Sequence, residues 1–188
     1  MTLRARQPEL TKSLIIDAAI AVANELGAAN FTLDAVVARL PVSKGALLHH
    51  FPSKLALLEA VIDHLGEDLL REVREAAAKD PNPYVRMSRA YLRVTVEDVG
   101  RPEDVSIGKV ALIAGLMEPS LAARWTRIVA EISAEDPVDP AGADDALLLR
   151  LLADGLWLSD IMGTTVIPRD QRRAIMHLLD AAPTKAPS

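Results

Sequence analysis

Hydrophobic positions recur at helical spacing along most of the chain. This pattern predicts helices over about residues 11–26, from Ser53 toward Lys79, over 104–117, from Pro119 onward, over 143–163 and over 169–181. Gly27 supplies a stop signal for the first of them. The β-branched run 164–167 is too short and isolated for a sheet, and we expect it to be a loop. The pattern therefore predicts an all-α protein of about nine helices.

Residues 31–54 contain three helix-start signals in close succession. The hydroxyls of Thr32, Ser43 and Ser53 can each accept a hydrogen bond from a backbone N–H of the following turn. About two helical turns follow Thr32 and end at Pro41, which lacks an N–H and blocks the turn before it. The segment after Ser43 is only about seven residues long, too short to be stable without packing support. Two short helices joined by a tight turn are typical of a helix-turn-helix, whose second helix enters the DNA major groove.

Small residues at the start of that second helix favour the same interpretation. Gly45 and Ala46 occupy its first turn, where a DNA reader brings its backbone close to the bases. Because glycine costs about 1 kcal/mol relative to alanine in a helix, we interpret Gly45 as serving close approach rather than stability. Taken alone, residues 31–54 leave open an ordinary pair of short helices in an all-α core.

Composition limits the class of protein. A chain of 188 residues, 50% hydrophobic and 25% charged, is globular and forms one or two domains. The absence of cysteine excludes thiol catalysis, thiolate zinc sites and disulfides. The N-terminal residues show no apolar signal-peptide core, and no uncharged apolar run is long enough to span a bilayer. We therefore expect a soluble, cytoplasmic protein with no membrane partner.

The net charge of −5 is unevenly distributed along the chain. Residues 1–56 carry six basic and four acidic groups, whereas the remainder carries 15 basic and 22 acidic groups. Since phosphate binding responds to the local basic footprint, this asymmetry fits a small DNA-facing head on an acidic body.

The second half of the chain predicts a self-associating body. Residues 143–163 leave hardly any polar face, so we expect a second subunit to cover part of this helix. Arg86, Arg89 and Arg93 share one side of an earlier helix, where we expect a solvated basic face.

No group of residues points to catalysis. His49, His50, His64 and His177 lie on different predicted helices without a ligand-spaced partner, so we expect no metal site. The sequence has neither a Gly-rich phosphate loop nor a nucleophile elbow. We expect a protein that is not an enzyme and has no cofactor.

Residues 11–58 resemble the N-terminal domain of the TetR family of transcriptional regulators. The resemblance rests on Thr11-Lys12, Ile16-Asp17-Ala18-Ala19, Gly27, Phe31-Thr32, Val42-Ser43-Lys44-Gly45-Ala46-Leu47, His50-Phe51 and Ser53-Lys54-Leu55-Ala56-Leu57. These elements cover about a quarter of the chain, and their combined order is more specific than any one of them. In two places the chain departs from the pattern: Leu40-Pro41 replaces the usual Ala-Gly, and Leu48 replaces a Tyr that often touches the DNA backbone.

The resemblance implies a homodimer of Ω-like, all-α subunits. A three-helix head over residues 1–56 would bind double-stranded operator DNA, and a long helix would join it to an effector-binding and dimerisation body over 57–188. The last two long helices of each subunit would pair into a four-helix bundle. A small molecule bound in the body would move the long helix, change the spacing of the heads and release the operator, as in a repressor.

The resemblance also suggests roles for individual residues. Thr32, Ser43 and Lys54 are candidate phosphate contacts, and Lys44, Ala46 and His49 are candidate base-edge contacts, with Leu48 at the position of the family's backbone contact. Phe31, Leu47 and Phe51 are expected in the core of the head. Candidate effector-site residues are Tyr91, Leu112, Leu116, Met117, Trp125, Trp157 and Asp160, each of which plain core packing would also explain. The alternative function is that of a dimeric all-α interaction protein that has lost specific DNA binding.

Overall fold

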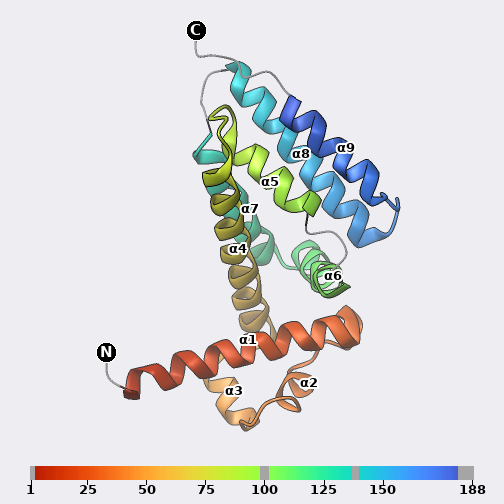
Figure 1. Ribbon diagram of the computed structural model, residues 1–188. Coiled ribbons are helices and arrows are strands. Elements are labelled where there is room, and N and C mark those ends of the chain that lie inside the picture. Colours follow the sequence, from red (N-terminus) through yellow and green to blue (C-terminus); the bar gives the residue numbers. More distant parts are fainter. Residues whose placement is uncertain (1–2, 98–101, 137–139, 182–188) are drawn as a thin grey trace. The chain divides into compact units, whose positions relative to one another are not determined.

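The computed structural model describes residues 3–97, 102–136 and 140–181, and these are helical throughout apart from short connections (Figure 1). The helices are α1 (Leu3–Asn30), α2 (Leu33–Val37), α3 (Lys44–His50), α4 (Lys54–Lys79), α5 (Arg86–Glu97), α6 (Pro102–Met117), α7 (Pro119–Ala134), α8 (Pro140–Met162) and α9 (Arg169–Ala181). Nine helices and no strand within the described residues confirm the predicted all-α fold.

Local sequence signals place most helix ends correctly. The bounds of α4 and α9 and the start of α7 follow the predicted positions, and residues 164–167 form a connection between helices, as expected. Helix α1 differs, because it begins at Leu3 rather than near Thr11. The preceding segment is rich in Leu, Ala, Arg, Gln and Glu, which favour helix even without an apolar stripe. Gly27 breaks α1 as predicted, with φ 70° and ψ 176°, but helical residues continue to Asn30.

The chain forms two compact units. Unit one comprises Met1–Gly66 and Arg101–Trp125, and unit two comprises Glu67–Gly100 and Thr126–Ser188, so that α4 contributes residues to both. In unit one, α1 packs on α6 and α2, and α2 packs on α3. Its apolar core includes Ile15, Val22, Phe31, Val36, Leu47, Phe51, Leu57, Val61 and Leu121. This confirms that Phe31, Leu47 and Phe51 belong to the core of the head.

Unit two is built around α5, which packs on α8 and α9. Its apolar core contains Leu70, Val73, Met87, Tyr91, Leu92, Val96, Ile132, Ala153 and Leu156. The prediction of a solvated basic face on α5 is wrong for Arg89, which is buried together with its partner Asp80. The reason is charge pairing, because the Arg89 Nε donates to an Asp80 carboxylate oxygen at 3.0 Å.

A row of large apolar side chains remains exposed on α8. Its members are between 42% and 66% exposed and comprise Leu147, Leu148, Leu151, Leu152, Leu158 and Met162. Single exposed leucines are ordinary, but several along one helix mark a surface that another molecule covers. Among the described residues, no helix is both long and apolar enough to cross a membrane.

Candidate DNA-reading face and effector residues

Helix α3 begins at a local cap and is fixed by one buried side chain. The Ser43 hydroxyl accepts a hydrogen bond from the Ala46 backbone N–H at 3.2 Å, as the sequence predicts. Leu47 is fully buried in the core of unit one and provides the packing that so short a helix needs. These contacts set the rotation of α3 about its axis and so decide which of its side chains face solvent.

The exposed face of α3 carries two of the three predicted base contacts, Lys44 and His49, together with Gly45 and Leu48. Lys44, Gly45, Leu48 and His49 are all exposed, and their spacing places them on one side of the helix. Ala46 is half-buried and lies on the flank of this side, with its N–H already bonded to Ser43. The face thus carries an ammonium, an imidazole and one apolar side chain, groups that suit base edges and thymine methyls.

Gly45 has no structural requirement within its own unit. A Cβ built on it would meet only the Ser43 Oγ, at 3.8 Å, an ordinary van der Waals separation. The fold therefore accommodates alanine at this position, and alanine would favour the helix. Packing within unit one therefore does not account for glycine at position 45.

An ion pair links the exposed face of α3 to α2. The Lys44 Nζ lies 2.6 Å from an Asp34 carboxylate oxygen, with the two side chains 54% and 74% exposed. A second exposed pair lies elsewhere in unit one, where Arg39 donates two hydrogen bonds to Glu25, each of 2.5 Å. The Arg39 guanidinium lowers the pKa of the Glu25 carboxyl through these hydrogen bonds. Neither pair follows from the spacing of charges in the sequence.

The predicted phosphate contacts have structural partners of their own. The Thr32 Oγ1 caps α2 by accepting from the Ala35 N–H at 3.1 Å. Because a hydroxyl both donates and accepts, Thr32 and Ser43 can cap their helices and still donate to a phosphate. The Lys54 Nζ donates to the Phe31 carbonyl oxygen at 2.8 Å and lies 5.4 Å from the centroid of the Phe31 ring. Lys54 therefore ties the start of α4 to the start of the helix-turn-helix, a role the sequence did not reveal.

The candidate effector residues divide between the two units. In unit one, Trp125 is half-buried against the apolar core and Leu112 is half-buried, whereas Leu116 and Met117 are 80% and 75% exposed at the end of α6. These four residues lie on α6 and α7. The structure does not enclose Leu116 and Met117 within unit one.

In unit two, the candidates lie on α5 and α8 and two of them are engaged in polar contacts. The Tyr91 hydroxyl donates to an Asp154 carboxylate oxygen at 2.7 Å, and burial, reinforced by this bond, raises the pKa of the Tyr91 phenol. The Asp160 carboxylate accepts from the buried Arg172 guanidinium. Trp157 is half-buried on α8. Both Tyr91 and Asp160 thus pair with a polar group from another part of unit two.

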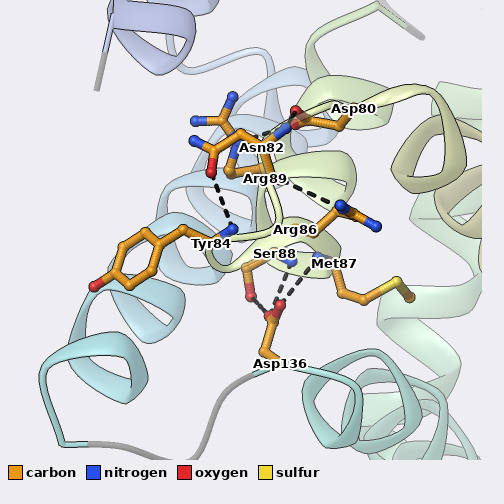
Figure 2. Close-up of polar contacts among 8 residues, drawn as sticks. All are labelled: Asp80, Asn82, Tyr84, Arg86, Met87, Ser88, Arg89 and Asp136. Atoms are coloured by element: carbon orange, nitrogen blue, oxygen red, sulfur yellow. Dashed lines mark hydrogen bonds and ion pairs between the residues drawn. The ribbon is translucent and has the colours of Figure 1, made fainter. Parts of the chain in front are cut away.

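A buried polar cluster joins the ends of α4 and α7 to the start of α5 (Figure 2). One Asp136 carboxylate oxygen accepts from the Met87 N–H and the other from the Ser88 N–H, each at 3.0 Å, and the Ser88 hydroxyl also donates to it. Asp136 thereby caps α5 from a distant part of the chain. Val85, just before α5, is held at φ 43°, a strained conformation for a β-branched residue.

Comparison with known proteins identifies the family. Residues 85–182 match the model of the tetracyclin repressor-like C-terminal domain, and residues 15–61 match that of the bacterial regulatory proteins of the tetR family. The chain belongs to the TetR family. Members of this family are ligand-responsive, DNA-binding repressors of transcription, and this chain is such a regulator.

Relatives that align with about 80% of this chain are named as transcriptional regulators. This chain is 31% identical over 159 residues to the HTH-type transcriptional regulator BetI of Burkholderia thailandensis, and the alignment covers 80% of this chain and 81% of that protein. It is 29% identical to BetI of Serratia proteamaculans, covering 79% and 80%. No relative supports the alternative of an interaction protein that has lost DNA binding.

Solved structures agree with the fold. A transcriptional regulator from Rhodococcus sp. Rha1 superposes with a TM-score of 0.71 at 21% identity, covering 89% of this chain and 92% of that one. The multidrug binding protein EbrR, complexed with ethidium, superposes with a TM-score of 0.66 at 28% identity, covering 89% and 96%.

Proposed function

We propose that this TetR-family chain acts as a homodimer whose two α3 helices read the half-sites of an operator. Lys44, Leu48 and His49 would contact base edges and methyl groups in the major groove, with Ala46 at the flank of this contact. Thr32, Ser43 and Lys54 would hold backbone phosphates and set the register. Half-sites would lie about one helical turn, or a small multiple of it, apart because the heads belong to a symmetric dimer.

One observation carries this proposal: the exposure of Lys44, Gly45, Leu48 and His49 together, opposite the fully buried Leu47. A short helix that buries one side and presents cationic and small residues on the other suits a groove floor. The formal charge of residues 1–56, six basic against four acidic groups, supports this orientation toward DNA.

The body, residues 57–188, would supply dimerisation and effector binding. The apolar row on α8 is the natural face for a second copy, since obligate homodimer interfaces resemble a domain core cut in half. The effector would be a small, mainly apolar molecule, because the chain has only two residues each of Phe, Tyr and Trp for stacking. The multidrug binding protein EbrR, which has the same fold, is complexed with ethidium, an aromatic organic cation, and this supports a small organic molecule as the class of effector.

Salt-dependent DNA binding separates reading from positioning. The probes are a duplex selected by the wild-type protein from a randomised library and a scrambled duplex of the same composition. Lys44→Ala should cost about 1–3 kcal/mol on the selected duplex and relax preference at one base position per half-site. Lys54→Ala should weaken both duplexes about equally and reduce the salt slope by about 1 per head.

Two outcomes would contradict this assignment. If Lys44→Ala loses equal affinity on both duplexes, Lys44 is a phosphate contact and does not read bases. If the wild-type protein selects no duplex over scrambled DNA, the assignment of specific reading to α3 fails.

A further inference from the structure

We infer that Asp34 is a specificity residue of the head: it holds the Lys44 ammonium for guanine reading and withholds it from phosphates. The inference rests on the proposed reading role of α3. It starts from the 2.6 Å contact between the Lys44 Nζ, on the exposed face of α3, and the Asp34 carboxylate.

The position of the pair suits this role. Lys44 is the first residue of α3, and Asp34 lies in the first turn of α2, ten residues earlier and across the tight turn of the motif. The Thr32 and Ser43 caps and the buried Val36 and Leu47 fix both short helices. The carboxylate is therefore held by a rigid element, whereas an unpaired lysine on a four-carbon stem would sample many positions.

The chemistry of the ammonium allows it to serve two partners at once. An ammonium carries three N–H donors, so one can remain on Asp34 while the other two reach the O6 and N7 acceptors of guanine. Binding of Lys44 to a phosphate is less favourable, because it would bring the Asp34 carboxylate close to the negatively charged DNA backbone. The pair thus opposes sequence-independent binding and permits reading of a base with two adjacent acceptors.

The exposure of the pair argues against a role in stability. Both side chains are more than half exposed, and ion pairs in this environment contribute little to folding. Asp34→Asn should consequently fold like the wild type, which a thermal unfolding curve will verify. An effect on DNA recognition would then come from the interface and not from loss of the head.

The test uses the full-length protein with the selected and scrambled duplexes described above. Asp34→Asn should bind scrambled DNA about threefold to tenfold more tightly, with a salt slope steeper by about 0.9 per head, because Lys44 becomes available to a phosphate. The ratio of selected to scrambled affinity should fall about fivefold to tenfold, since Lys44 loses its orientation. Discrimination at the guanine position should relax most.

A matched control removes the same charge from the other exposed pair of unit one. Glu25→Gln also makes the head more positive by one charge and releases Arg39, which is outside the reading face. It should raise affinity for both duplexes by a similar factor and leave their ratio within about twofold of the wild type. If only the net charge of the head mattered, Asp34→Asn and Glu25→Gln would have the same effect on the ratio of selected to scrambled affinity.

A double variant assigns the effect to Lys44. In a Lys44→Ala background, Asp34→Asn should no longer lower the affinity ratio. The inference is overturned if Asp34→Asn leaves the ratio unchanged, matches Glu25→Gln, or lowers the ratio equally without Lys44. A wild-type protein that selects no duplex would overturn the proposed reading role itself, and this inference with it. Selection by the wild type together with an unchanged ratio in Asp34→Asn would overturn the inference alone.

Discussion

The helix-turn-helix segment and unit two distribute polar and apolar groups in opposite ways. In residues 31–54, the buried side chains are all apolar, and the ion pair between Lys44 and Asp34 lies in solvent. In unit two, the pair between Asp80 and Arg89 is buried, while five leucines of α8 are exposed.

This difference reflects the partner that each region meets. A surface that binds DNA keeps its charged side chains in solvent, where an ion pair contributes little to folding and leaves N–H donors available to bases. A surface that binds a second copy of the chain needs apolar area, and unit two then relies on buried polar contacts to fix its internal geometry.

The largest effect should come from the buried ion pair of unit two. Asp80→Ala leaves the Arg89 guanidinium buried without its carboxylate, and removing one partner of a buried pair costs about 3–5 kcal/mol. We expect the free energy of unfolding of the full-length protein, measured with urea, to fall by that amount. Glu135→Ala is the matched control, because its pair with Arg74 is exposed and should cost less than about 1 kcal/mol. Equal costs for the two variants would show that burial does not distinguish these pairs.

Next in size is the effect of charge on the apolar row of α8. Leu148 and Leu152 are 66% and 42% exposed in the single chain, so glutamate at either position should be tolerated by the folded subunit. In a dimer the same charge would be desolvated without a partner, and we expect association to weaken by at least about 2 kcal/mol. Light scattering should report monomers for Leu148→Glu and Leu152→Glu. Ala143→Glu, exposed at the start of α8 outside the row, should remain dimeric; dimers of all three variants would place the interface elsewhere.

Acid should weaken the buried pair by a smaller amount than its deletion. Burial raises the pKa of the Asp80 carboxyl, but the Asn82 backbone N–H, the Arg89 hydrogen bond and the charges of Arg89 and Arg93 outweigh burial and lower that pKa overall. The pair therefore contributes its full stability above the pKa of an unfolded aspartate and loses it as the pH falls through the lower folded value. Unfolding curves at decreasing pH should show this loss in the wild type. The same component should be missing from Asp80→Ala, and an identical pH dependence in both proteins would assign the acid sensitivity to other groups.

Local signals in the sequence predicted most of the fold. Helix starts at Thr32, Ser43 and Ser53 were predictable because a hydroxyl caps the turn next to it, and all three caps are present. The exposed face of α3 follows from the same logic, once Leu47 is recognised as its buried residue. These features depend on residues close together in the chain.

Contacts between distant residues could not be predicted in this way. Asp136 caps α5 from 48 positions away at Ser88, and Lys54 bonds the carbonyl of Phe31 across 23 positions. The spacing of Arg89 on α5 predicts a surface arginine, and only the folded position of Asp80 explains its burial. An isolated charge in the sequence does not reveal whether its partner will lie in solvent or in the core.

The smallest change in stability is expected for Gly45→Ala, and it is the one variant here that should become more stable. Gly45→Ala meets no steric obstacle within the chain, since the nearest atom to the new Cβ would be the Ser43 Oγ at 3.8 Å. Alanine should therefore raise the free energy of unfolding by as much as about 1 kcal/mol through its better helix propensity. The added methyl would nevertheless hold the α3 backbone away from the bases, so affinity for the selected duplex should fall while affinity for scrambled DNA changes little. Unfolding curves and DNA titrations on the same preparation measure both quantities.

A variant that is more stable and binds the selected duplex as tightly as the wild type would contradict close approach at Gly45. A more stable variant with weaker specific binding would show that the glycine is retained for DNA, at the expense of the helix that carries it.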